Sequence, residues 1–129
     1  SKDILLFFEE LENRKINKKK ITLNLAYNYG SWNELEICIK RILNDIKKNN
    51  ISFADINENL IKNNLFTKDM PNPDLLIRTG GQKRLSNFLL LQLKYAEFFF
   101  IDKLWPDFEE SILVNILNEY SHKNRTFGL

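Results

Sequence analysis

The sequence predicts an α/β fold in which a mostly parallel sheet is flanked by helices. Segments of strand length alternate along the chain with apolar stripes at helical spacing, which is typical of parallel strands joined by crossover helices. Residues 74–78 form a short apolar run, as a parallel strand buried on both faces would. Right-handed crossovers would then place helices on both faces of the sheet.

The predicted elements follow in the order helix, strand, helix, short helix, strand, helix, strand, helix. We expect three parallel strands, at Ile21–Tyr27, Asp74–Arg78 and Ala96–Ile101. We expect five helices, over Asp3–Arg14, from Ser31 to Ile46, over Asp55–Asn63 and Leu85–Leu93, and from Pro106 to Gly128. A sheet of three strands is small, so either the chain is short or its sheet continues elsewhere.

Local signals support several of these elements. Apolar and polar residues alternate over Ile21–Tyr27, which is the period of a strand with one apolar face. Ser31 and Glu34 have the spacing of a capping box at the start of the second helix. Asp107 and Glu110 are expected to act as cap and partner at the start of the last helix.

Composition narrows the class of protein. The 129 residues make about one domain. The longest apolar runs fall short of the roughly 18 residues that a membrane span needs. The single cysteine, Cys38, excludes an intrachain disulfide and fits a reducing cytoplasm, where we expect it to be a small buried hydrophobe. A net charge of +2, without aromatic side chains interleaved in a basic stripe, argues against a nucleic-acid-binding module.

The residues that could bind a ligand or take part in catalysis lie just after the predicted strand that ends at Arg78. Within nine positions the chain places two arginines, two glycines and a serine, namely Arg78, Gly80, Gly81, Arg84 and Ser86. Arginines are forked, permanently charged donors, and a glycine pair lets backbone N–H groups approach a ligand closely. Ser86 would lie at the positive end of the predicted helix that follows. This pattern predicts a diphosphate site, with a glycine turn carrying surface arginines as the alternative.

The same stretch resembles the signature of the cis-prenyltransferases. The residues that carry the resemblance are Pro-Asp-Leu-Leu-Ile-Arg-Thr-Gly-Gly at 73–81, Arg-Leu-Ser-Asn-Phe-Leu-Leu at 84–90, Tyr-Ala-Glu at 95–97 and Leu-Trp-Pro-Asp-Phe at 104–108. Upstream, Leu-Asn-Leu-Ala-Tyr-Asn-Tyr-Gly at 23–30 is similar to that family's Asn-x-Ala-x-Asn-Tyr-Gly turn, and Asn-Arg-Thr-Phe-Gly at 124–128 is similar to its ending. The motifs occur in the family's order from residue 22 to the end.

This resemblance implies a transferase that condenses isopentenyl diphosphate with an allylic, farnesyl-type diphosphate to build a cis-polyprenyl diphosphate such as undecaprenyl diphosphate. Arg78, Arg84 and Ser86 match the residues that hold isopentenyl diphosphate, and Glu97 matches a carboxylate that coordinates Mg²⁺. Arg125 is implied to reach the active site from the tail. The enzyme would be cytoplasmic, either free or peripheral to the membrane that holds its product.

The resemblance also implies a homodimer. Phe98-Phe99-Phe100 on the last predicted strand is our candidate for the core of the interface, because three consecutive side chains point to both faces of a strand. The alternative is a strand buried between two layers of helices.

The chain departs from the family pattern in four places, one of which is Thr126, where many members have a second arginine before Phe-Gly. Gln82-Lys83 stands where bacterial members commonly have Glu-His, and a protonated lysine can pair with phosphate but cannot ligate a metal. Ser31-Trp32 follows the Asn-Tyr-Gly turn in place of Gly-Arg. The Asp-Gly-Asn-Gly-Arg loop, with the family's essential aspartate, does not occur. We therefore interpret residues 1–129 as the carboxy-terminal part of a single cis-prenyltransferase domain, inactive by itself.

A second hypothesis is a non-catalytic partner subunit of a heteromeric cis-prenyltransferase. Such partners tend to lose the arginine and serine motif. All four motif residues, Arg78, Arg84, Ser86 and Glu97, are present here, which favours the enzyme.

Overall fold

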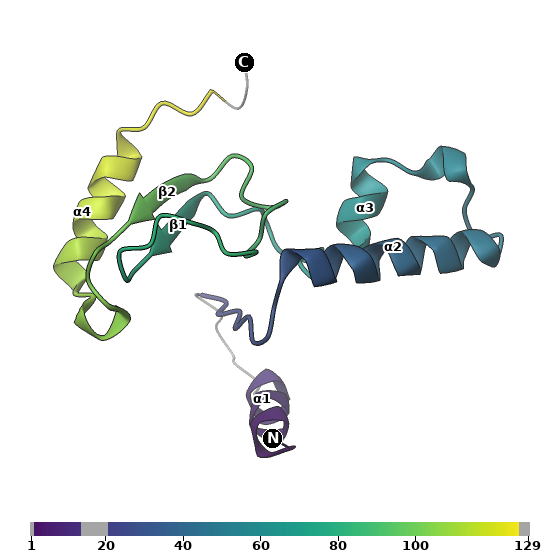
Figure 1. Ribbon diagram of the computed structural model, residues 1–129, viewed down its shortest axis with the longest axis horizontal. Coiled ribbons are helices and arrows are strands. Elements are labelled where there is room, and N and C mark those ends of the chain that lie inside the picture. Colours follow the sequence, from purple (N-terminus) through teal and green to yellow (C-terminus); the bar gives the residue numbers. More distant parts are fainter. Residues whose placement is uncertain (1, 14–20, 127–129) are drawn as a thin grey trace.

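A computed structural model describes residues 2–13 and 21–126 of the chain. Its elements are four α-helices, two strands and two short 3₁₀ helices, shown in Figure 1. The α-helices are α1 (Lys2–Asn13), α2 (Ser31–Lys47), α3 (Glu58–Asn64) and α4 (Glu110–Ser121), and the 3₁₀ helices are η1 (Phe53–Asp55) and η2 (Trp105–Asp107). The strands are β1 (Leu75–Arg78) and β2 (Glu97–Phe100). No helix in the described part of the chain is long and apolar enough to cross a membrane.

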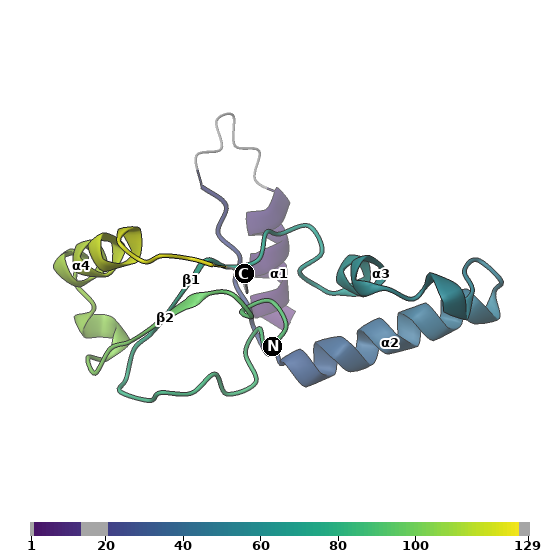
Figure 2. The same cartoon turned by 90° about the horizontal axis from the view of Figure 1, so that it is seen from above.

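The two strands pair in parallel, with Leu75 opposite Glu97 and Arg78 opposite Phe100. Helix α4 lies beside this sheet, and the pair formed by α2 and α3 extends away from it on the other side (Figures 1 and 2). The predicted α/β class with a parallel sheet and flanking helices is therefore confirmed.

The most deeply buried apolar residues join α2 to α3. Cys38, Ile42 and Leu65 are buried together. Four partly buried side chains pack around them: Ile46, Ile51, Leu60 and Ile61. The prediction that Cys38 is a small buried hydrophobe is confirmed, since it is only 1% exposed.

The first predicted strand, Ile21–Tyr27, is not formed. Its apolar side chains are exposed, to 87% at Ile21 and 79% at Leu23, and the segment joins neither strand of the sheet. Alternation of apolar and polar residues indicates which face of a strand could be buried, but the strand also needs backbone partners and an apolar cover. Helix α1 likewise leaves Leu5 and Phe7 more than half exposed.

The predicted helix over Leu85–Leu93 is wrong as well. This segment is a series of turns in which Ser86, Asn87 and Leu89 have positive φ angles of 50°, 65° and 47°. The left-handed region is unfavourable for residues with a side chain and cannot be part of a right-handed helix. The apolar residues of this segment had suggested a helix, but its backbone is bent by contacts with α2.

The predicted helix caps differ in the structure. Helix α2 has Gly30 as its N-cap, while the side chains of Ser31 and Glu34 are buried and bonded to other segments. Asp107 lies in η2, so α4 begins at Glu110 with Glu109 as its N-cap. Helix α4 ends at Ser121, well before Gly128, which lies outside the described residues.

Candidate diphosphate site

Arg78 is the centre of the candidate site. It is the last residue of β1, and its backbone carbonyl accepts a hydrogen bond of 2.8 Å from the N–H of Ile101. Its guanidinium Nη1 donates to Ser86 Oγ at 3.1 Å and also to the backbone carbonyl of Arg84. The structure therefore brings Arg78 and Ser86 together at the carboxyl end of the strand, although eight positions separate them in the sequence.

Arg84 contributes its backbone to this arrangement and leaves its side chain exposed. Among the described residues no hydrogen bond or ion pair of the Arg84 guanidinium is found. A forked cation held beside Arg78 and open to solvent is suited to bind an anion. Lys83, the residue before it, is exposed in the same loop.

The glycine pair has a structural part in the loop. Gly80 and Gly81 have φ angles of +86° and +72°, which L side chains rarely adopt. Their N–H groups donate to the carbonyls of Lys103 at 2.8 Å and Ile101 at 2.9 Å. The expectation that these two amides are offered to a ligand is therefore not met, because both are used to join the loop to the segment after β2.

A buried polar hub around Glu34 contacts the turns that follow the arginine loop, and no sequence pattern indicates it directly beyond the S-x-x-E spacing that we interpret as a cap. Glu34 is 1% exposed and accepts hydrogen bonds from Tyr29 Oη at 2.5 Å, Phe66 N at 2.8 Å and Gln92 Nε2 at 2.9 Å. Burial, and then the hydrogen bond to Glu34, raises the pKa of Tyr29. Gln92 also donates to Thr67 Oγ1 at 2.9 Å. Three segments, at Tyr29, Phe66 and Gln92, are thus tied to one carboxylate.

Glu97 does not join the other predicted site residues within one chain. It begins β2 opposite Leu75, whereas Arg78 ends β1 opposite Phe100. Three residues along a strand span about 10 Å and reverse the face to which a side chain points. Glu97 and Arg78 therefore lie at opposite ends and on opposite faces of the sheet.

This placement bears on the predicted Mg²⁺ site. The part of the chain that the structure describes contains no group of three or more His, Cys, Asp or Glu residues that could hold a metal. A magnesium ion could use one carboxylate together with substrate phosphates, but Glu97 does not face the Arg78 loop. The residues of a single chain thus do not fit a magnesium ion shared between Glu97 and a diphosphate at Arg78.

Arg125 is also placed away from the candidate site. Its guanidinium donates to Asp74 Oδ1 at 2.6 Å, to Tyr120 Oη at 3.0 Å and to the carbonyl of Tyr95 at 3.2 Å. These partners lie at the start of β1, before β2 and at the end of α4, which is the end of the sheet opposite Arg78. Within one chain Arg125 fastens the tail to the sheet and does not reach the arginine loop.

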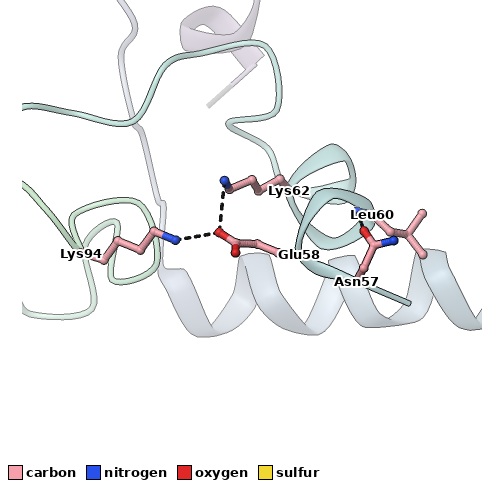
Figure 3. Close-up of polar contacts among 5 residues, drawn as sticks. All are labelled: Asn57, Glu58, Leu60, Lys62 and Lys94. Atoms are coloured by element: carbon pink, nitrogen blue, oxygen red, sulfur yellow. Dashed lines mark hydrogen bonds and ion pairs between the residues drawn. The ribbon is translucent and has the colours of Figure 1, made fainter. Parts of the chain in front are cut away.

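A separate cavity of about 480 Å³ lies beside α3 and does not include Arg78, Arg84 or Ser86. At its rim the Glu58 carboxylate pairs with Lys62 at 3.1 Å and Lys94 at 2.6 Å (Figure 3). The three side chains are each between 41% and 64% exposed. They form a solvated ion-pair cluster that links α3 to the turns after the arginine loop.

An α/β fold that gathers arginines and a serine beyond the end of a parallel strand is typical of proteins that bind anionic ligands there. The family model that matches residues 1–128 is described as "Putative undecaprenyl diphosphate synthase". The chain belongs to this family, the cis-prenyltransferases.

Individual relatives agree with this assignment. The chain is 44% identical over 116 residues to an isoprenyl transferase of Clostridium tetani, covering 90% of this chain and 46% of the relative. It is 41% identical over 133 residues to a farnesyl-diphosphate-specific ditrans,polycis-undecaprenyl-diphosphate synthase of Photorhabdus laumondii, covering 98% of this chain and 52% of the relative. The chain thus spans about half the length of the curated relatives it matches.

Solved structures show the same relationship. A probable undecaprenyl diphosphate synthase from Campylobacter jejuni matches with a TM-score of 0.75 and 32% identity, over 99% of this chain and 55% of that one. A lavandulyl diphosphate synthase from Lavandula x intermedia, in complex with dimethylallyl diphosphate, matches with a TM-score of 0.75 and 38% identity, over 78% of this chain and 44% of that one.

Proposed function

We propose that this chain supplies the isopentenyl-diphosphate half of a cis-prenyltransferase active site. The assembled enzyme would condense isopentenyl diphosphate with an allylic, farnesyl-type diphosphate to build a cis-polyprenyl diphosphate such as undecaprenyl diphosphate, a lipid carrier precursor for cell-wall glycan synthesis. On this proposal, residues 1–129 are the carboxy-terminal part of one catalytic domain.

The observation that carries the proposal is the arrangement around Arg78. Its guanidinium reaches Ser86 Oγ at 3.1 Å, and the exposed Arg84 side chain stands in the same loop. Two arginines and a hydroxyl can satisfy several oxygens of one diphosphate by charge-assisted hydrogen bonds. In this proposal Gly80 and Gly81 shape the loop through their positive φ angles and leave the binding of the anion to the side chains.

The retained anion-binding side chains favour the enzyme over the non-catalytic partner subunit. The Arg84 guanidinium is exposed in the loop whose backbone Arg78 holds, so its donors are available to an anion, and a subunit that only stabilises a catalytic partner would have no need of them. The residues at this loop therefore support a substrate-binding role.

Three further parts of the proposal rest on the resemblance. Mg²⁺ would be the cofactor, with Glu97 as one ligand in the assembled enzyme, although Glu97 does not face the Arg78 loop of its own chain. The enzyme would act in the cytoplasm, where the free thiol of Cys38 is stable, and its product would enter the membrane.

The enzyme would be a homodimer, with exposed apolar side chains such as Phe98, which is 41% exposed, in the interface. Light scattering of the assembled enzyme at micromolar concentration tests the dimer, and a clean monomer would refute it.

A chimera tests the function. The matching segment of the Clostridium tetani isoprenyl transferase is replaced by this chain, and incorporation of labelled isopentenyl diphosphate onto farnesyl diphosphate is measured with Mg²⁺. We expect elongation that is strongly reduced by Arg78→Ala and unchanged by Lys47→Ala, a substitution at the exposed end of α2. A folded chimera that does not elongate any allylic primer would reject the enzyme and favour the partner subunit.

A further inference from the structure

Asn87 joins the arginine loop to the start of helix α2. Its backbone carbonyl accepts a hydrogen bond of 2.8 Å from the N–H of Ser31, and its side-chain Oδ1 accepts one of 3.1 Å from the N–H of Trp32. These two N–H groups belong to the first turn of α2, where no carbonyl of the helix itself is available to them. Asn87 therefore caps the N-terminus of α2, although it lies 55 residues after Trp32 in the sequence.

Helix α2 also accepts a hydrogen bond from the loop. Ser31 Oγ accepts from the N–H of Leu90 at 2.9 Å, and Ser31 is 4% exposed. In the same region the rings of Tyr29 and Phe88 meet edge to face, with their centroids 5.7 Å apart. The three hydrogen bonds and the ring contact fix the backbone immediately after Ser86.

The fit between Asn87 and the helix depends on Gly30. A Cβ atom at Gly30 would lie 2.7 Å from Asn87 Nδ2, which is closer than real contacts allow. Gly30 has an extended backbone that any residue can adopt and provides no side-chain cap of its own. The N-cap position is thus left without a side chain, and that space is filled by Asn87.

Asn87 is also held in the left-handed region, with a φ of 65°, next to Ser86 with a φ of 50°. Asparagine tolerates this conformation better than most residues, but two such residues in succession need external contacts to persist. Helix α2 supplies such contacts to Asn87 through the N–H of Ser31. Arg78 supplies one to Ser86 by donating a hydrogen bond to its Oγ.

From these contacts we propose that Asn87 is a positioning residue for the diphosphate loop. It does not bind the diphosphate. By bonding to the N-terminus of α2 it fixes where Ser86 Oγ and the Arg84 backbone stand relative to Arg78, and Gly30 is small because Asn87 occupies the cap position. The inference rests on the proposed function, in which this loop binds a diphosphate.

The test separates positioning from simple capping of α2. Asn87→Gly keeps the positive φ at no steric cost and removes only the side-chain contact with Trp32. Gly30→Ser combined with Asn87→Gly gives α2 a local N-cap in the space that Asn87 has vacated. Binding of inorganic pyrophosphate to the chimera with the Clostridium tetani isoprenyl transferase is followed by NMR titration at the resonances of residues 1–129, and the thermal midpoint reports the stability of each variant.

We expect Asn87→Gly to weaken pyrophosphate binding by roughly ten-fold, because a loop that is no longer preorganised must be ordered by the ligand. The double variant should regain the thermal midpoint of the parent without regaining its affinity. Restored affinity in the double variant would mean that Asn87 only caps the helix, and unchanged affinity in Asn87→Gly would remove it from any role at the site.

The outcome is separable from that of the proposed function. If pyrophosphate binding depends on Asn87 while the chimera fails to elongate, the inference stands and the enzymatic proposal falls. If the chimera elongates equally well with Asn87→Gly, the function stands and the inference falls. A parent chimera in which residues 1–129 show no response to pyrophosphate would overturn the inference directly.

Discussion

Arg78 and Arg84 are six positions apart in the sequence and act differently in the loop. The Arg78 guanidinium is engaged with Ser86 and with the Arg84 carbonyl, so it fixes the loop while keeping its charge close to the site. The Arg84 guanidinium is exposed in the same loop. Arg78 therefore holds the loop in place, whereas the Arg84 guanidinium has donors available for a ligand.

This division predicts a specific effect of Arg84→Ala. In an active chimera the apparent Michaelis constant for isopentenyl diphosphate should rise roughly ten-fold or more, since a charge-assisted hydrogen bond is worth about 1.5–3 kcal/mol. The fold should be unaffected, because only the backbone of Arg84 takes part in it. Steady-state kinetics with Lys47→Ala as the matched control measures this, and an unchanged constant would remove Arg84 from the site.

Tyr29 should give the hub around Glu34 a measurable pH dependence. Burial and the hydrogen bond to Glu34 raise the pKa of Tyr29 above its ordinary value of 10.0, so the folded state favours the neutral phenol. Its contribution to stability is complete below pH 10 and is lost as the pH rises from 10 through the raised pKa of the folded state. The free energy of unfolding of the parent should therefore fall more steeply above pH 10 than that of Tyr29→Phe. Urea unfolding at several pH values compares the two, and parallel curves would contradict the shift.

At the scale of elements, sequence patterns were most reliable where an element meets its neighbours within this chain. Strands β1 and β2 lie within the predicted ranges Asp74–Arg78, which is a continuous apolar run, and Ala96–Ile101, which is rich in aromatic residues. Helix α2 was predicted from an apolar stripe, which packs against α3 and the residues that follow it.

The errors have a common physical origin in contacts that no local pattern encodes. Ile21–Tyr27 has the period of a strand but finds no backbone partner among the described residues. Residues 85–93 have helical composition, yet the long-range bonds of Asn87 and Leu90 to Ser31 hold them in turns. The residue types of the site were predictable from their spacing after a strand. Their geometry was not, because it depends on a helix that begins more than fifty residues earlier.

The loop that links β1 to Arg84 should be sensitive to a methyl group at Gly80. Gly80 has a φ of +86°, and a Cβ there would be 3.9 Å from Leu104 Cδ2, so space is available and backbone strain is the only cost. Gly80→Ala should lower the free energy of unfolding by roughly 1–2 kcal/mol. Gly80→Asn should cost less, because asparagine tolerates the left-handed region. Urea unfolding measures the free energy of unfolding of both variants. Equal losses would show that steric contacts, and not the φ angle, determine the cost of a side chain at Gly80.

At the scale of the whole molecule, a large part of the apolar surface has no partner within the described chain. The sheet has two strands, whereas three or more with an apolar face are usually needed for independent stability. Leu5, Leu6, Leu23 and Leu25 are each more than half exposed. The curated relatives are about twice as long as the segment they share with this chain. The two-stranded sheet and these exposed side chains fit the proposal that residues 1–129 are the carboxy-terminal part of one catalytic domain.

The described arginines provide a site for one diphosphate, whereas the reaction needs two. Elongation requires two diphosphates side by side with their reacting carbons aligned. The loop from Arg78 to Ser86 can hold one of them. Two other described arginines are already engaged: Arg41 donates to the carbonyl of Asn64 at 3.0 Å, and Arg125 is paired with Asp74 at 2.6 Å. Within the described residues we therefore find no second cradle for the allylic diphosphate.

It follows that the isolated chain should not elongate farnesyl diphosphate, even with Mg²⁺ and excess isopentenyl diphosphate. Incorporation of labelled isopentenyl diphosphate into extractable product measures this, with the chimera as the positive control for the assay. Elongation by the isolated chain would mean that its own residues form the allylic site, and the exposed segment Ile21–Tyr27 would be the first place to look for the missing contacts.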